Sequence, residues 1–368
     1  MSGIIIISLG RWGAMVFKPC RFSDCNIDDA FFDSLKEDYP EFIQWFGKKA
    51  SADEYVYVYR DPSEQIQALL YLKENECEAV GELPPEPRIK IGTLKVCSTS
   101  EGRRIGEGAI GMALWKWRDS SFNQIYVTVY PKHENIIELL KKYGFVMSGK
   151  KGGEDIYMKD KTKLDYSDPA KSFPYINPKF ETARYIPIED AFHDKMFQFS
   201  DLKGVLKPDS EMPVSNGITK SFVATPTSKI DFVMGDLVFM YRKCTEKGAI
   251  KSYRSAVTSF CTVSHVEIIR QGWKYLKSFQ EFKKSVGNKT VYSEDELKNT
   301  YEKANVYVID LLYNGFFGEG NNVNYAGLKD SGLWGDQHPY LFKLSREQAI
   351  ELLKMGGKDE YDIVINQS

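Results

Sequence analysis

The spacing of apolar residues divides roughly the first 160 positions into a mixed set of strands and helices. A half-buried strand places apolar residues at every second position, whereas one buried helix face places them at i, i+3, i+4 and i+7. The strands predicted in this way are 15–22, 55–59, 65–73, a run ending at 96, 124–130 and 155–158. The predicted helices are 28–39, 41–49, a helix through 110–117, and 134–143. The expected core of the first two helices is Phe31, Phe32, Leu35, Phe42, Trp45 and Phe46.

The stretch from Ile91 to Trp117 joins a predicted strand to a predicted helix through a corner that contains glycine. The corner reads Arg103-Arg104-Ile105-Gly106-Glu107-Gly108, and the helix after it shows one apolar stripe. Glycine allows backbone N–H groups to approach a ligand closely, and a helix N-terminus carries partial positive charge. A strand, a glycine turn and a helix start in this order predict a cradle for a pyrophosphate group.

Two motifs in this part of the chain resemble those of the GNAT acetyltransferases. Arg103, Gly106 and Gly108 fit the pattern Gln/Arg-x-x-Gly-x-Gly/Ala, and the helix from Asn135 to Gly144-Phe145 fits the second motif. The resemblance covers residues 15–160 and implies an α+β fold with a mixed, mostly antiparallel sheet flanked by helices. It implies acetyl-CoA as co-substrate. A Rossmann dinucleotide site is the competing interpretation, but its glycines follow the first strand of a βαβ unit, not several strands.

The resemblance also implies which residues hold acetyl-CoA. The strand Thr93–Cys97 would bind the pantetheine arm and polarise the thioester carbonyl, and the N–H groups of Arg104–Ala109 would hold the pyrophosphate. The implied cofactor-binding residues are Leu94, Val96, Arg103, Arg104, Ile105, Gly106, Glu107, Gly108, Ala109, Asn135 and Lys142. The spacing departs from the family, because Val96 lies seven residues before Arg103 where five is usual.

The groups that would handle protons are less defined. Leu140 occupies the position where many relatives have a tyrosine, which leaves Tyr143, Tyr130 and His133 as candidate acids. Tyr143 also fits the apolar stripe of its helix, so a core role remains open. A thiolate with a pKa near 8.5 also leaves without an acid. Residues 88–98 carry no carboxylate base, which favours an α-amine acceptor such as the aminoacyl end of tRNA.

The second half of the chain predicts a separate domain. Residues 161–184 are rich in Pro, Ser, Asp and Lys and are interpreted as a linker. Residues 185–368 show predicted strands at 235–242, 253–263, 266–269 and 306–313, and capping boxes at 293–296 and 345–348. This arrangement predicts a small β-barrel with helical insertions.

The run Gly235-Asp236 and the apolar strand after it resemble the PUA-like superfamily, which includes ASCH and EVE domains. The resemblance implies binding of single-stranded RNA or a modified base. Arg242, Tyr253, Arg254 and Trp273 combine aromatic and basic character, as in sites that hold unstacked bases. Half-buried strand aromatics with solvated arginines are the alternative. Tyr241 shares this strand, and Trp334 and His338 are further candidates.

Charge and cysteine usage narrow the function without fixing it. Lys and Arg number 49 against 51 Asp and Glu, giving a net charge of −2, so a nucleic-acid site would be a local patch. Six scattered cysteines without a Cys-x-x-Cys pair, and four histidines without metal-ligand spacing, predict a cytoplasmic protein without a metal site. No apolar run reaches transmembrane length, and residues 1–14 are expected to be an extension.

Three functions follow as hypotheses. The first is an acetyl-CoA-dependent N-acetyltransferase that acts on RNA or on an amine attached to RNA. The second is a small-molecule or protein acetyltransferase whose C-terminal domain only shapes the acceptor site. The third is a binding protein in which the first domain senses acyl-CoA without catalysis.

Overall fold

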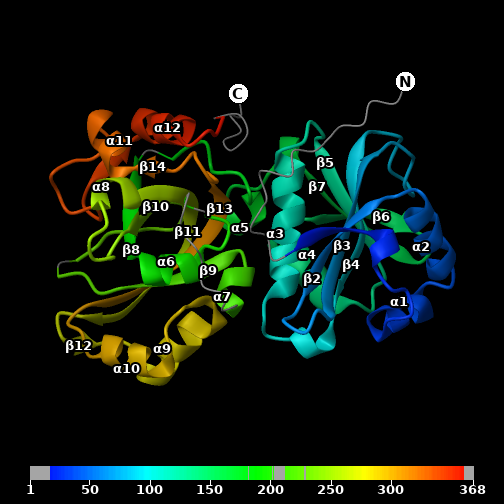
Figure 1. The fold of residues 1–368 in the computed structure, drawn as a ribbon, viewed down its shortest axis with the longest axis horizontal. Coiled ribbons are helices and arrows are strands. Elements are labelled where there is room, and N and C mark those ends of the chain that lie inside the picture. Colours follow the sequence, from blue (N-terminus) through cyan, green and yellow to red (C-terminus); the bar gives the residue numbers. More distant parts are fainter. Residues whose placement is uncertain (1–16, 181, 201, 203–211, 228, 360–368) are drawn as a thin grey trace. The chain divides into compact units, whose positions relative to one another are not determined.

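The chain divides into two compact units at Leu164–Asp165. The structure is a computed structural model that describes residues 17–180, 182–200, 202, 212–227 and 229–359. The predicted extension 1–14 and the first two residues of the predicted first strand lie outside the described residues. Figure 1 shows the first unit in blue to green and the second unit in green to red.

The first unit is built on one seven-stranded sheet with the order β1-β2-β3-β4-β5-β7-β6. Its strands are β1 (Lys18–Arg21), β2 (Tyr55–Arg60), β3 (Ile66–Glu76), β4 (Arg88–Val96), β5 (Gln124–Val129), β6 (Val146–Lys151) and β7 (Glu154–Asp160). Its α-helices are α1 (Asp33–Asp38), α2 (Phe42–Ser51), α3 (Ile105–Arg118) and α4 (Glu134–Lys142). All neighbouring strands are antiparallel except β4 and β5, which are parallel. The predicted α+β class and element order are confirmed, with β6 as an additional strand.

Helices cover both faces of this sheet. Successive residues of a strand point to opposite faces, so a strand with apolar residues at successive positions needs a cover on each side. Leu69 and Tyr71 of β3 pack with Phe22, Phe32 and Phe46 in an aromatic cluster under α1 and α2. The alternate β3 residues are also fully buried, and α3 contacts β3, β4 and β5. All six residues predicted as core of α1 and α2 belong to or pack against the aromatic cluster.

A bulge in β4 precedes the point at which β4 and β5 separate. The β3–β4 register shifts at Gly92, so Tyr71 pairs with Thr93 and Leu72 with Ile91. A Cβ atom on Gly92 would lie 2.6 Å from the ring of Tyr71, so only glycine fits beside that ring. The parallel pairing with β5 ends at Ile91–Val127, while β4 continues to Val96. The two strands therefore splay apart beyond this bulge.

The second unit has an eight-stranded sheet with the order β15-β8-β10-β11-β13-β9, and β12 and β14 pair with β11. The strands are β8 (Thr182–Glu189), β9 (Thr219–Ala224), β10 (Leu237–Lys243), β11 (Ala256–Gln271), β12 (Lys274–Tyr275), β13 (Val306–Phe316), β14 (Val323–Asn324) and β15 (Lys343–Ser345). The helices are α5 (Pro169–Ser172), α6 (Asp190–Met196), α7 (Pro213–Asn216), α8 (Lys251–Arg254), α9 (Phe279–Val286), α10 (Glu294–Tyr301), α11 (Tyr325–Asp330) and α12 (Arg346–Met355). The described strands do not close into the predicted barrel, since the sheet ends at β15 and β9.

Two further predictions for the second unit, the linker and a break between two strands, differ from the structure. Part of the expected linker 161–184 packs inside this unit, because Phe173 and Ile176 are fully buried. Most of the two strands predicted at 253–263 and 266–269 forms the single strand β11, which continues across the predicted break at Ser264–His265. The prediction is wrong at its start, because Tyr253 and Arg254 belong to α8. The capping boxes at Ser293 and Ser345 are confirmed at the starts of α10 and α12.

Two hydrophobic clusters stabilise the second unit, and β11 contributes to both. The main cluster includes Val257 and Phe260 of β11, together with side chains of β8, β10 and α12. The α9–α10 cluster consists of Val223, Ile269, Phe282, Val286, Leu297, Val306 and Val308. Burial of apolar side chains in both clusters is the main source of stability.

Candidate functional site

A groove of about 980 Å³ opens in the first unit where β4 and β5 separate. Gly92–Val96 of β4 and Val127–Val129 of β5 form its floor. The start of α3 lies at one side of it, and residues of α1, α2 and the first turn of α4 complete its walls. The groove is large enough for a ligand of drug size.

The separated part of β4 has an edge that β5 no longer pairs, and its residues line this groove. β3 pairs with β4 as far as Ala68–Val96, so one edge of β4 is occupied. In an antiparallel ladder every second residue turns its N–H and C=O to the other edge. Beyond Ile91 that other edge no longer has β5 as its ladder partner. An extended ligand with amide groups could therefore bind here as an added strand.

The N-terminus of helix α3 lies beside this edge. Arg104 adopts a left-handed conformation with φ 59°, and its side chain makes no capping hydrogen bond. The first backbone bond of the helix runs from Gly108 N to Arg104 O. Gly106 lines the groove, whereas Ile105 and Ala109 are buried. Of residues 104–109, which were predicted to form the anion cradle, Gly106 lines the groove, and anion binding there stays a prediction.

Arg104 and Lys142 lie against Glu107 beside this turn, and Arg103 binds Tyr59. Nε of Arg104 donates to Oε2 of Glu107 at 2.9 Å, and Lys142 Nζ lies 3.7 Å from Oε1 of Glu107. Arg103 Nη2 donates to the hydroxyl of Tyr59 at 2.6 Å. None of these four motif residues (Arg103, Arg104, Glu107 and Lys142) lines the groove. Their contacts fix the corner, and Lys142, about half exposed, remains accessible to an anion.

Tyr143 is fully buried, and its hydroxyl donates to Oε1 of Glu107 at 2.5 Å. It does not line the groove, so the structure favours the core role over the role of proton donor. Its backbone carbonyl accepts a bond from the buried Lys159 Nζ at 2.6 Å. Burial lowers the pKa of Lys159 well below its usual value. Through the bond from its hydroxyl to Glu107, Tyr143 connects the end of α4 to the start of α3.

Of the other two candidate acids, one lines the groove and the other does not. His133 lines the groove, and its Nε2 lies 3.3 Å from Oδ2 of Asp38. Tyr130 packs its ring against Tyr39 at 5.4 Å and lies outside the lining of the groove. Leu94, Val96 and Asn135, which were predicted to contact the co-substrate, all line the groove.

The groove is also lined by polar residues that the motifs did not mark, and three of them lie close together. Glu154 of β7, Tyr39 and Asp38 line the groove although they lie far from the motifs in the sequence. The Tyr39 hydroxyl donates to Oε1 of Glu154 at 3.1 Å. Burial, reinforced by the Glu154 carboxylate, raises the pKa of Tyr39 well above its usual range, so Tyr39 stays protonated. Only tertiary structure reveals this carboxylate, because no local pattern marks it.

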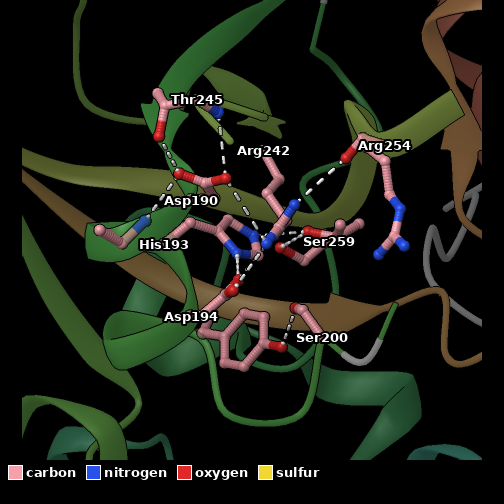
Figure 2. Close-up of polar contacts among 11 residues, drawn as sticks. Asp190, His193, Asp194, Ser200, Arg242, Thr245, Arg254 and Ser259 are labelled. Atoms are coloured by element: carbon pink, nitrogen blue, oxygen red, sulfur yellow. Dashed lines mark hydrogen bonds and ion pairs between the residues drawn. The ribbon is translucent and has the colours of Figure 1, made fainter. Parts of the chain in front are cut away.

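Arg242 is buried inside the second unit, contrary to the prediction that it contacts nucleic acid. Its Nε and Nη2 donate to the two oxygens of Asp194, both at 2.8 Å (Figure 2). Its Nη1 donates to the backbone carbonyl of Arg254 at 3.2 Å. A guanidinium satisfied in this way cannot also bind a phosphate without breaking the ion pair.

Asp194 joins this arginine to a buried histidine (Figure 2). His193 Nδ1 lies 2.8 Å from Asp194 Oδ1, and its Nε2 lies 2.8 Å from Thr258 Oγ1. Burial alone would raise the pKa of Asp194, but the hydrogen bonds from Arg242 and His193 outweigh it. They hold the pKa of Asp194 well below its usual range. The group is a structural ion-pair network, because each member has its partners inside the protein.

Of the remaining predicted nucleic-acid residues, Arg254 contacts this network through its backbone carbonyl, whereas Tyr253 and Trp273 lie at the surface. Tyr253 and Trp273 are 63% and 68% exposed. Arg254 is half-buried, and Figure 2 shows its side chain directed away from the network. The Trp334 ring packs 4.6 Å from that of Tyr241, and the His338 ring lies 5.0 Å from that of Tyr340.

No cluster of possible metal ligands occurs among the residues that the structure describes. Within the same residues, no helix combines the length and the apolar character needed to cross a membrane.

Comparison with known proteins gives structural neighbours only. The chain matches no family model and no curated protein sequence. A GNAT-family acetyltransferase from Listeria monocytogenes 4b F2365 is 15% identical with a TM-score of 0.28, covering 39% of this chain and 94% of its own. A GNAT-family acetyltransferase from Staphylococcus aureus Mu50 is 10% identical with a TM-score of 0.30, covering 39% and 99%. PaiA N-acetyltransferase from Thermoplasma acidophilum, in complex with coenzyme A, is 14% identical with a TM-score of 0.28, covering 40% and 99%. Values this low do not assign the chain to a family.

Proposed function

We propose that the first unit is an acetyl-CoA-dependent N-acetyltransferase. The observation that carries this proposal is the groove between the separated strands β4 and β5, which leads to the uncapped start of α3. An open strand edge suits the amide groups of pantetheine, and a helix N-terminus suits a diphosphate. These are the two features of coenzyme A that a protein backbone can recognise.

The residues of the chain fit this co-substrate at each point. The N–H groups at Gly106 would hold the diphosphate, and Lys142 would add a positive charge near it. The edge formed by Leu94 and Val96 would hold the pantetheine arm and direct a backbone N–H to the thioester oxygen. Asn135 also lines the groove. Arg103, Arg104 and Glu107 position the corner.

The reaction needs a neutral amine and an outlet for its proton. The amine nitrogen forms a bond to the acetyl carbon, the carbon–sulfur bond breaks, and the sulfur leaves as a thiolate. Glu154 is the carboxylate that we assign as base, since it lines the groove and Tyr39 orients it. The leaving thiolate has a pKa near 8.5 and needs little help, and His133 is the groove residue that could protonate it. Tyr130 and Tyr143 receive no role.

For the acceptor we propose a chemical class, an amine, and not a particular molecule. The reason for preferring an α-amine was the lack of a base on β4, and Glu154 supplies one from β7, so lysine amines become accessible as well. An RNA-linked amine stays within the proposal. Its support is now limited to the exposed aromatics Tyr253 and Trp273 and the half-buried Arg254, because Arg242 is buried. Comparing acetylation of an α-amino peptide, a lysine peptide and aminoacyl-tRNA discriminates these acceptors.

Substitution of Gly106 by alanine tests the co-substrate site. The added methyl group would lie 3.7 Å from Val96 Cγ2 and 3.9 Å from Leu139 Cδ2, which are ordinary contacts. The fold should therefore tolerate it, and helix propensity adds up to about 1 kcal/mol of stability. The methyl would occupy the space needed by the diphosphate. We expect the affinity for acetyl-CoA, measured by isothermal titration calorimetry, to fall at least about tenfold, or about 1.4 kcal/mol.

Gly47→Ala is the matched control. Gly47 lies within α2, and its added methyl group would meet no atom within 4 Å. This variant should gain similar stability and keep its affinity for acetyl-CoA. An unchanged affinity in Gly106→Ala, with the fold intact, would refute the proposed co-substrate site. Binding without any acetyl transfer to the acceptors above would favour the acyl-CoA-sensing function instead.

A further inference from the structure

Two cysteine sulfurs meet at the edge of the first unit. The Sγ atoms of Cys20 and Cys25 lie 3.7 Å apart. Cys20 belongs to the edge strand β1, and Cys25 follows the single 3₁₀ turn Phe22–Asp24. The backbone bond from Cys25 N to Phe22 O, 3.1 Å long, closes this turn. The chain reversal that it makes is what brings the two sulfurs together.

The two thiols differ in their environments. Cys25 is only 5% exposed and belongs to the aromatic cluster, whereas Cys20 is half-buried at the edge of that cluster. Burial, together with the neighbouring Cys20, raises the pKa of Cys25 to about 12. Cys25 is therefore a protonated, protected thiol, and Cys20 is the sulfur that a small oxidant reaches first.

We propose that Cys20 and Cys25 form an oxidant-responsive dithiol that a peroxide converts to an intramolecular disulfide. The peroxide transfers one oxygen to the Cys20 thiol, giving a sulfenic acid and one water molecule. The Cys25 sulfur then attacks the Cys20 sulfur, the S–O bond breaks, and the departing hydroxide takes the thiol proton as water. The sulfurs must approach by about 1.7 Å to reach the S–S bond length.

The disulfide would fix a part of the unit that supports the groove. The ring of Phe22, inside the closed turn, contacts Trp45 at 5.6 Å and Phe46 at 5.2 Å, both edge-on. Trp45 and the adjacent Phe42 line the groove. The cross-link therefore restrains the segment on which this wall of the groove packs. Any effect on catalysis rests on the proposed function, whereas the modification itself does not.

Mass spectrometry of the full chain provides the test. The reduced protein is treated with a small excess of hydrogen peroxide, and the remaining thiols are alkylated. We expect the oxidised pair to be about 2 Da lighter than two free thiols and to take up no alkyl group. Trypsin cleaves after Arg21, between the two cysteines, so the disulfide joins two peptides that are otherwise separate. Linked peptide should fall more than tenfold in Cys20→Ser and in Cys25→Ser.

Cys77→Ser is the control, because Cys77 is exposed and its thiol bonds to Asn75. It should keep the full yield of linked peptide. If Cys25→Ser fails to fold, Cys20→Ser, which changes a residue at the strand edge, still tests the proposal. Oxidation of Cys20 to the sulfinic acid, linkage of Cys20 to any other cysteine, or an unreacted pair would each overturn the proposal. These outcomes are read from mass, so they are independent of acetyl transfer.

Discussion

Glu154→Gln is expected to lower kcat/KM for acetyl transfer to an amine by about 10²-fold at pH 7, since a positioned base typically contributes 10² to 10⁴. Glutamine has the same shape and keeps an oxygen that can accept the bond from Tyr39. It cannot take a proton, however. An acceptor amine with a pKa near 10 would then depend on the small neutral fraction present in solution. Acetyl-CoA binding should be unchanged.

The pH profile separates loss of a base from loss of structure. In the variant, the rate should rise with pH toward the pKa of the acceptor amine, and the deficit should shrink there. Glu138→Gln is the control, because Glu138 is an exposed residue of α4 outside the groove. A uniform loss at every pH, or no loss at all, would remove Glu154 from the proposed mechanism.

Asp194→Asn is expected to destabilise the second unit by about 3 kcal/mol or more, the range found when one partner of a buried ion pair is removed. Arg242 is 5% exposed and would keep its charge with only Asp190, at 3.9 Å, as a remaining carboxylate. Asparagine keeps one amide oxygen for His193 Nδ1, but its NH2 group would face an N–H donor of Arg242 where the second carboxylate oxygen had accepted. Urea denaturation, followed by circular dichroism, measures the change in unfolding free energy.

The same carboxylate makes the unit sensitive to acid. Its pKa is lower in the folded protein than the value of about 3.9 in an unfolded chain. The stabilisation is therefore complete above about pH 5 and is lost as the pH falls below the unfolded value toward the folded one. In Asp194→Asn this part of the pH dependence should be missing.

Glu294→Gln is the control for Asp194→Asn. It removes the ion pair between Lys283 and Glu294, whose side chains are 34% and 53% exposed. Pairs of this kind contribute at most about 1 kcal/mol. If Asp194→Asn cost no more than this control, the network would have no structural role, and a surface function for Arg242 would have to be reconsidered.

The first unit could be predicted largely from its sequence because its signals are local. Strand alternation, the helix stripes and the glycine corner each depend on residues a few positions apart, and they located six of its seven strands. β6 was missed because Val146 and Met147 are largely exposed, so no apolar face marks it. The base was missed because Glu154 reaches the groove only through the pairing of β7 with β5.

The second unit was predicted less well because its decisive contacts are distant in sequence. Arg242 at the end of an apolar strand has the same local pattern whether it faces solvent or a buried carboxylate. Its partner Asp194 lies 48 residues earlier, on α6. The expected linker has a polar composition, which hides the fact that Phe173 and Ile176 are buried. Their burial depends on strands that come later in the sequence. Closure of a barrel likewise depends on which strands pair, and alternation does not encode that.

The length of β11 has a consequence for how the second unit denatures. Its 16 residues hydrogen-bond to four partner strands, and its two halves enter different clusters, Val257 and Phe260 in one and Ile269 in the other. Fraying of either half removes ladder bonds and buried area from the same continuous segment. The α9–α10 region should therefore melt together with the rest of the unit, so slow amide hydrogen exchange would extend along all of β11 with one common opening energy.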